Sequence, residues 1–144
     1  MSSATLTEFL RHPKDVIERV REEGQVRLTR RGDADLVIVR GDELDALRDG
    51  AALASRIGRA AARNGGDVRE GLRSLFAWTS LLSAAELGDY AQEVERLVYA
   101  SAETGRYGAL LQAQAGWAGT AEAYAAGLGP APVEATGATP VERP

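Results

Sequence analysis

The first two dozen residues carry hydrophobic positions at helical spacing. The segment Thr5–Arg11 is typical of a short helix capped by a threonine, and Pro13 suits the first turn of a second helix. Val16, Ile17 and Val20 follow at the spacing of one helix face. Gly24 is placed to end this second helix. The pattern therefore predicts two short helices over residues 5–23.

The hydrophobic period then changes from helical spacing to a period of two. Residues 25–31 alternate between apolar and polar side chains, and residues 36–39 form the mostly β-branched run Leu-Val-Ile-Val. Such a run is typical of a strand that is buried on both faces. Gly32 and Asp33 between the two segments indicate a turn. Residues 25–40 are therefore predicted to form an antiparallel β-hairpin, followed by a helix that Asp42 caps.

A second copy of the chain is expected to cover this hairpin. A two-stranded hairpin is barely stable in water, and two short helices cannot cover both of its faces. We therefore expect a homodimer, with the interface at Val26, Leu28, Leu36 and Ile38.

The second half of the chain has helical periodicity throughout. The breaker cluster Asn64-Gly65-Gly66 marks the expected boundary. One helix is expected from Val68 to Leu82, a second begins at the capping box of Ser83 and Glu86 and ends at Gly105, and a third runs from Tyr107 to Leu128. The chain is thus predicted to comprise an α+β dimerisation domain over residues 1–64, an all-helical region over residues 67–128 and a disordered Pro/Ala/Gly-rich tail over residues 129–144.

Composition narrows the range of functions. The chain has 144 residues, no cysteine, a single histidine and a net charge of −4. The absence of cysteine excludes disulfides, thiolate zinc sites and cysteine nucleophiles. Motifs for a nucleophile–base pair, a phosphate loop or a metal site are missing as well, so we expect neither an enzyme nor a bound cofactor. The sequence shows no signal peptide and no apolar run of membrane-spanning length, which favours a cytoplasmic protein without membrane contact.

Charge divides unevenly between the two halves. Residues 1–63 carry a net charge of +1 and residues 64–144 carry −5. Lysine occurs once against sixteen arginines, which is typical of a GC-rich bacterial genome.

The basic residues near the start of the fold are candidates for phosphate binding: Arg11, Lys14, Arg27, Arg30 and Arg31. The alternative is a solvated strand face whose arginines pair with Glu22, Glu23 and Asp35. Charge alone favours the alternative, because this half is nearly neutral.

An ordered set of short motifs resembles the prevent-host-death (Phd/YefM) antitoxin family over about residues 5–60. The set comprises the helix start Thr7-Glu8-Phe-Leu-Arg11, a helix ending Glu23-Gly24, an apolar strand ending in the Thr29-Arg30 pair, a Gly32 turn, the strand Leu36–Val39 and the helix start Asp42–Leu47. The resemblance implies a dimeric α+β fold that binds operator DNA, represses its own operon and neutralises a toxin with the segment beyond the dimer domain. The family's Thr-Arg arginine corresponds to Arg30 and its helix-start arginine approximately to Arg11, although Leu10 and Pro13 depart from the family pattern.

With the resemblance, the leading hypothesis is a type II antitoxin that represses its own operon and binds its toxin through the helical region. The candidate toxin contacts lie on the first predicted C-terminal helix: Leu72, Leu75, Phe76 and Trp78. Core packing is the alternative for these side chains, although Trp78 lies off the apolar stripe and is predicted to be exposed. A second hypothesis is a stand-alone dimeric transcription regulator whose helical region senses a ligand or builds oligomers. A third is a purely structural interaction module.

Overall fold

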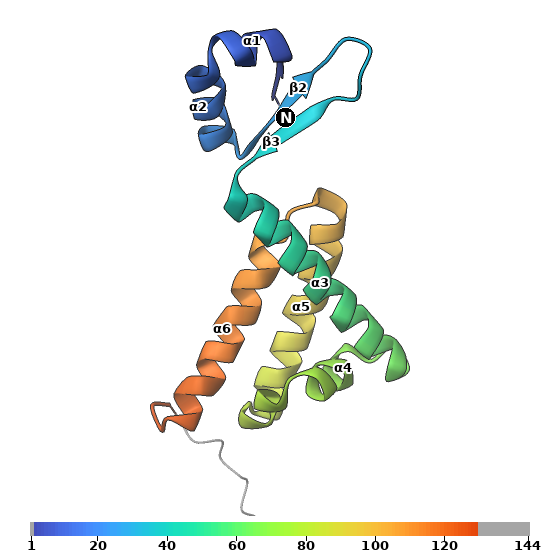
Figure 1. The fold of residues 1–144 in the computed structure, drawn as a ribbon. Helices are drawn as coiled ribbons and strands as arrows, with labels where there is room; N and C mark the ends of the chain where they lie inside the picture. Colours follow the sequence, from blue (N-terminus) through green and yellow to red (C-terminus); the bar gives the residue numbers. More distant parts are fainter. Residues whose placement is uncertain (1, 130–144) are drawn as a thin grey trace, which may run out of the picture. The chain divides into compact units, whose positions relative to one another are not determined.

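The computed structural model describes residues 2–129, which belong to two compact units, Met1–Asp49 and Gly50–Pro144. Figure 1 shows a small mixed unit at the N-terminus and a helical unit that follows it in the chain. Residues 130–144 of the predicted tail lie outside the described residues.

The N-terminal unit is a three-stranded mixed sheet with two helices and the start of a third. Its strands stand in the order β1-β2-β3, with β1 parallel to β2 and β2 antiparallel to β3. The register places Ala4 beside Leu28 and Val26 beside Ile38. The elements are β1 (Ser2–Thr5), α1 (Leu6–Arg11), α2 (Pro13–Glu23), β2 (Gln25–Thr29) and β3 (Leu36–Val39).

The hydrophobic pattern carries no signal for β1. Its residues, Ser-Ser-Ala-Thr, show no hydrophobic alternation, and the parallel pairing with β2 is a long-range contact. The sheet is therefore larger than the expected two-stranded hairpin, and β2 has a neighbouring strand on each side.

One face of the sheet is covered by the unit's own helices. Val26 and Leu28 of β2 pack with Ala4 of β1 and with Val16 and Val20 of α2 into a buried core. This arrangement corrects the sequence-based interface, because Val26 and Leu28 are buried within a single chain and are not accessible to a second copy. Ile38 also packs against this core, whereas Leu36 stays exposed.

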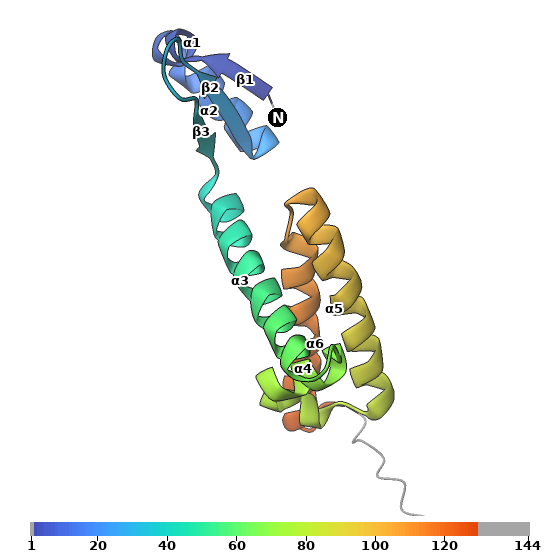
Figure 2. The same ribbon diagram turned by 90° about the vertical axis from the view of Figure 1, so that its right-hand side faces the viewer.

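The helical unit consists of the second part of α3 with the helices that follow it. The helices are α3 (Gly41–Arg63), α4 (Val68–Leu75), the 3₁₀-helix η1 (Ala77–Leu81), α5 (Ala84–Thr104) and α6 (Gly108–Ala125). Figures 1 and 2 show α5 and α6 side by side along most of their length. The capping box of Ser83 and Glu86 begins α5, and Gly105 ends it in the left-handed conformation, both as predicted.

The boundary between the units falls at residue 50 and not at the glycines near residue 65. Leu53 and Ile57 on α3 are buried in the core of the helical unit. The glycines Gly65 and Gly66 form the turn that leads from α3 to α4, where both adopt positive φ angles. The breaker cluster therefore marks a helix end, and burial places the boundary a few turns earlier.

The first C-terminal helix is shorter than predicted. Phe76 adopts an extended conformation (φ −125°, ψ 104°), which ends α4 and separates it from η1. Leu72 is completely buried, and Leu75, Phe76 and Trp78 are half-buried against the same core. Trp78 stacks on Phe76 and contacts Tyr90, with ring centroids 5.6 and 5.4 Å apart. The prediction that Trp78 is exposed is therefore wrong. Leu72 belongs to the core, and Leu75, Phe76 and Trp78 pack against it while part of each side chain stays accessible.

Close helix packing in this unit depends on two glycines. A Cβ added at Gly50 would overlap the side chain of Tyr107, and one added at Gly71 would lie 2.7 Å from the backbone nitrogen of Ala61. Both glycines therefore allow neighbouring segments to approach more closely than any side chain would permit. Within residues 2–129, every helix is too short or too polar to span a lipid bilayer.

Candidate nucleic-acid interface

The basic residues predicted from the sequence gather mainly at one end of the N-terminal unit. Figure 1 shows α1, the start of α2 and the β2–β3 turn at the end of this unit that is opposite to residues 41–49. Arg11 and Lys14 lie at the junction of α1 and α2, and Arg30 and Arg31 begin the turn. Arg27 lies farther along β2, on the sheet face opposite to the helices.

A shallow recess joins the two arginines of the turn to α1. It is lined by Thr5, Leu6, Thr7, Thr29, Arg30, Arg31 and Asp33. Two guanidinium groups and three hydroxyl groups therefore lie around one surface depression. Guanidinium and hydroxyl groups are donors that proteins use to bind phosphate oxygens. The Thr29 hydroxyl donates its proton to the Ala4 carbonyl, so the hydroxyl donors of the recess are Thr5 and Thr7.

Part of the positive charge is neutralised within the turn. Arg30 Nη2 donates to Asp33 Oδ2 at 3.0 Å, and the backbone N–H of Arg30 donates to Asp35 Oδ1 at 3.4 Å. Arg27 Nη1 lies 3.4 Å from Asp35 Oδ2. The alternative interpretation, a strand face with paired charges, is thus correct for Asp35, although Glu22 and Glu23 form no ion pair within residues 2–129.

The remaining candidates are exposed cations. Arg11, Lys14 and Arg31 are exposed and form no ion pair with any residue that the structure describes. An exposed cation without a carboxylate partner breaks no existing interaction when it meets a phosphate. These three side chains and Arg30 therefore form the accessible positive charge of this end.

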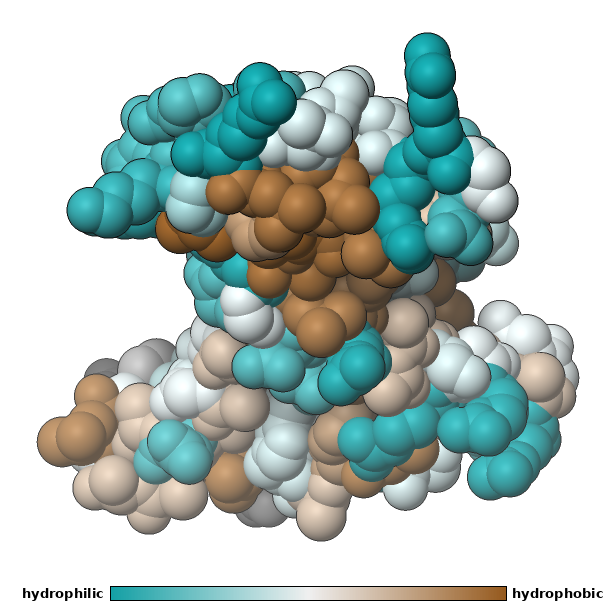
Figure 3. All heavy atoms as spheres, turned by 45° about the horizontal axis from the view of Figure 1, so that its top comes forward, coloured by the Kyte–Doolittle hydropathy of each residue, from teal (hydrophilic) through white to brown (hydrophobic). Residues whose placement is uncertain are grey.

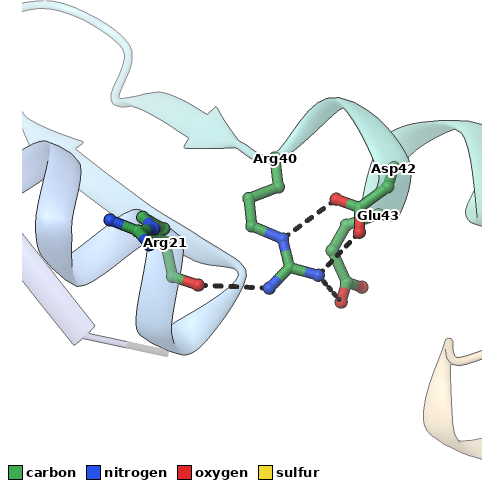
Figure 4. Close-up of polar contacts among 4 residues, drawn as sticks. All are labelled: Arg21, Arg40, Asp42 and Glu43. Atoms are coloured by element: carbon green, nitrogen blue, oxygen red, sulfur yellow. Dashed lines mark hydrogen bonds and ion pairs between the residues drawn. The ribbon is translucent and has the colours of Figure 1, made fainter.

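Other arginines of the unit stabilise its fold by connecting neighbouring elements. Arg19 Nη2 donates to Ser2 Oγ at 2.8 Å and to the Ser3 carbonyl at 3.0 Å, which ties β1 to α2. Arg40 likewise connects α2 with the start of α3 (Figure 4). It donates to both carboxylate oxygens of Asp42, at 2.9 and 2.8 Å, and to the Arg21 carbonyl at 3.1 Å. The hydrogen bonds from Arg40 hold the pKa of the Asp42 carboxyl below its usual value.

Sequence reasoning missed the hydroxyl groups of the recess. It assigned Thr5 to a helix cap, and Thr5 Oγ1 does accept a hydrogen bond from the Glu8 N–H at 3.0 Å. Thr29 Oγ1 donates to the Ala4 carbonyl at 3.4 Å, and Thr7 is exposed. The one sequence signal for the group is the threonine beside Arg30, but its proximity to Thr5 and Thr7 depends on the parallel pairing of β1 with β2.

A second surface feature of this unit is apolar. Figure 3 shows hydrophobic side chains gathered on one face, between strongly polar regions. The large apolar side chains that this unit exposes are Leu10, Ile17, Leu36, Val37 and Leu47. Leu36 and Val37 point to opposite faces of β3, which is an edge strand, and they are 48% and 44% exposed.

Known proteins give no guide to this site. Comparisons with protein-family models, with curated proteins and with solved structures find no match to the chain. Among the described residues, no group of three or more His, Cys, Asp or Glu side chains is arranged to hold a metal ion.

Proposed function

We propose that this protein is a cytoplasmic DNA-binding repressor of its own operon that also acts as the antitoxin of a partner toxin. The observation that carries the proposal is the recess in which Arg30 and Arg31 lie beside the hydroxyl groups of Thr5 and Thr7. After β1, the elements follow in the order of two helices, a strand ending at Thr29, a glycine turn, a strand and a helix. This order supports the proposal because the Phd/YefM resemblance implies the same one.

Arg30 and Arg31 are assigned to the DNA backbone. Guanidinium groups bind phosphate oxygens with paired donors, and hydroxyl groups add hydrogen bonds that fix the register of a backbone. The unit as a whole is not basic, so its net charge does not attract DNA. The proposed phosphate contacts therefore depend on the local charge of these arginines. Arg11 and Lys14, at the same end of the unit, are assigned as flanking phosphate contacts.

Homodimerisation is part of the proposal. The edge strand β3 presents Leu36 and Val37 to solvent, and exposed apolar edge strands favour pairing with another chain. Because the helices cover one face of the sheet, we assign the interface to β3 and the opposite face, in place of Val26 and Leu28. A dimer would also double the number of phosphate contacts.

A stand-alone transcription regulator is the second candidate. It is favoured by the helical unit, which has its own core and a groove between α5 and α6 lined by Glu93, Arg96 and Trp117 among others. Co-expression with the neighbouring reading frame separates the two candidates. Rescue of growth and co-purification of the neighbouring product favour the antitoxin, and failure of both favours the regulator.

DNA binding is tested with the variant R30A/R31A and the DNA immediately upstream of the protein's own coding region. We expect the affinity to fall roughly tenfold or more, and the slope of log K against log salt to decrease by about 0.9 for each phosphate that the variant no longer binds. Fluorescence anisotropy at several salt concentrations measures both quantities.

The matched control is R21A/R48A, which removes the same charge from exposed positions of the same unit. Among the residues that the structure describes, Arg21 pairs only with Glu18 at the surface, and its carbonyl group remains for Arg40. Equal affinities of the wild type and R30A/R31A would contradict the proposal, and so would equal reductions in both variants.

A gain in affinity is expected from the substitution Asp33→Asn. The Asp33 carboxylate lies 3.0 Å from Arg30 and lines the recess, so it competes with a phosphate and repels it. Its removal should tighten DNA binding several-fold at low salt, with little effect in high salt because the interaction is exposed and screened. The substitution Asp45→Asn, at an exposed position of α3 in the same unit and at the end opposite to the recess, is the control. Weaker or unchanged binding by Asp33→Asn would place the phosphate elsewhere.

A further inference from the structure

The second part of α3 carries a row of exposed arginines that the proposed function does not use. Arg56, Arg59 and Arg63 follow one another at spacings of three and four residues, which places them along one side of the helix. All three are exposed. We call these three residues the arginine row. They belong to the helical unit, whereas Arg30 and Arg31 belong to the N-terminal unit.

The positive charge of the row is local. The stretch from Gly50 to Gly66 contains these three arginines and no carboxylate. None of the three forms an ion pair within residues 2–129. By contrast, α5 carries a single arginine, Arg96, and five carboxylates: Glu86, Asp89, Glu93, Glu95 and Glu103. The row is therefore a basic strip on an otherwise acidic unit.

Helix electrostatics explain only one of the three arginines. A cation in the last turn of a helix is stabilised by the helix dipole, and Arg63 occupies that turn. The effect falls off within one turn, so it does not account for Arg56 or Arg59.

The side chains between the arginines are small, so the helix surface between them is recessed. Ser55, Gly58 and Ala62 are the exposed residues of α3 around the row. Gly58 and Ala62 line a depression together with Glu95, Val98 and Tyr99 of α5. A Cβ added at Gly58 would meet nothing within 4 Å, so packing within the unit does not require glycine there. Glycine inside a helix is less favourable than alanine. The recessed surface allows a rigid partner to approach the helix backbone between the guanidinium groups.

The chemistry of the row favours a polyanion over a protein. Protein interfaces are anchored by buried aromatic or large apolar side chains. The exposed residues of α3 along this strip are arginine, serine, glycine and alanine, and the exposed Tyr99 of α5 borders them at Gly58 and Ala62. The guanidinium of Arg56 lies 5.6 Å from the centroid of the Phe76 ring, which orients the group while its N–H donors stay at the edge of the plane.

We propose that the arginine row binds backbone phosphates of duplex DNA, as a second and sequence-independent contact of this protein. The inference goes beyond the proposed operator contacts and stands without them, because the row lies in the other unit.

The experiment uses the full-length chain and a fluorescein-labelled duplex of arbitrary sequence, with anisotropy measured over a series of salt concentrations. The test variant is R56Q/R59Q/R63Q, and the matched control R48Q/R96Q/R106Q removes three other exposed arginines. We expect the salt slope of the test variant to fall by about 2.7 per chain, from about 0.9 for each of three phosphate contacts. The control should change the slope by less than about one contact.

Two further variants keep the result interpretable. The charge-conserving variant R56K/R59K/R63K should retain most of the salt slope, because lysine also binds phosphate as a point charge. Circular dichroism of R56Q/R59Q/R63Q should match the wild type, because glutamine is a good helix former at exposed positions. The variant R30A/R31A is measured in parallel on the upstream DNA and on the arbitrary duplex.

The inference is overturned if the wild type shows no salt-dependent binding to the arbitrary duplex, or if the slope falls equally in the test and control variants. It is also overturned if R56Q/R59Q/R63Q keeps its DNA affinity but no longer co-purifies with a protein partner, since the row would then bind protein. If R30A/R31A keeps full preference for the upstream DNA while the slope of R56Q/R59Q/R63Q falls, the operator contacts proposed above fail and the arginine row stands.

Discussion

Replacing Val37 with aspartate is expected to convert the proposed homodimer into folded monomers. Val37 lies on the edge strand β3, on the sheet face opposite to α2, and is 44% exposed in the single chain. A carboxylate there meets water in the monomer but would be buried without a partner in a dimer. Burial of an unpaired charge costs about 3 kcal/mol or more, roughly a hundredfold in the dissociation constant. Sedimentation or light scattering across a concentration series measures the change.

The control for this prediction is Ser3→Asp. Ser3 is exposed on the same face of the sheet but lies on the opposite edge strand, β1. The substitution should leave the assembly unchanged. A Val37→Asp protein that sediments as a dimer of wild-type affinity would remove β3 from the interface, and a monomeric wild type would contradict dimerisation itself.

The substitution Leu72→Ala is expected to destabilise the helical unit by about 2–5 kcal/mol. Leu72 is completely buried in the core formed with Leu53, Ile57 and Tyr90, and truncation leaves a cavity that the packed helices fill only in part. Thermal unfolding followed by circular dichroism measures the change in stability. The same substitution at Leu128, which is 80% exposed, should alter stability by less than about 0.5 kcal/mol.

This comparison also bears on the proposed toxin binding. If Leu72 contacted the toxin directly, Leu72→Ala would abolish binding while the helical unit kept its wild-type melting temperature. We expect binding and stability to fall together, since Leu72 has no surface to offer a partner. A stable Leu72→Ala protein that fails to bind the toxin would restore the contact that the sequence suggests.

Local sequence signals predicted the ends of several elements correctly. Pro13 lies in the first turn of α2, Gly24 ends that helix with a φ of 89°, and Ser83 with Glu86 forms the capping box of α5. These features depend on backbone geometry and on hydrogen bonds between residues at most four positions apart. The residue types at those positions therefore contain the information needed.

The sequence predicted only part of the candidate site, because only some of its residues lie close together in the chain. Arg30 and Arg31 are identifiable from the strand and turn in which they lie, and the pairing of Arg27 with Asp35 follows from the turn. The hydroxyl groups of Thr5 and Thr7 are not identifiable in this way, because they reach the site through the pairing of β1 with β2 across more than twenty residues.

Short-range patterns were thus sufficient for the boundaries of α2 and α5, the basic character of the β2–β3 turn and the helical nature of the second half. They did not predict β1, the start of α3 at Gly41 or the end of α4 at Leu75. Three features required the assembled fold: Val26 and Leu28 face α2, Trp78 packs against Tyr90, and α3 joins the helical unit from Gly50 onward. These features depend on hydrophobic burial. The hydrophobic effect is non-directional, so it does not specify which segments of the chain pack together. An apolar pattern indicates that a face must be covered, and the packing of distant segments determines which residues cover it.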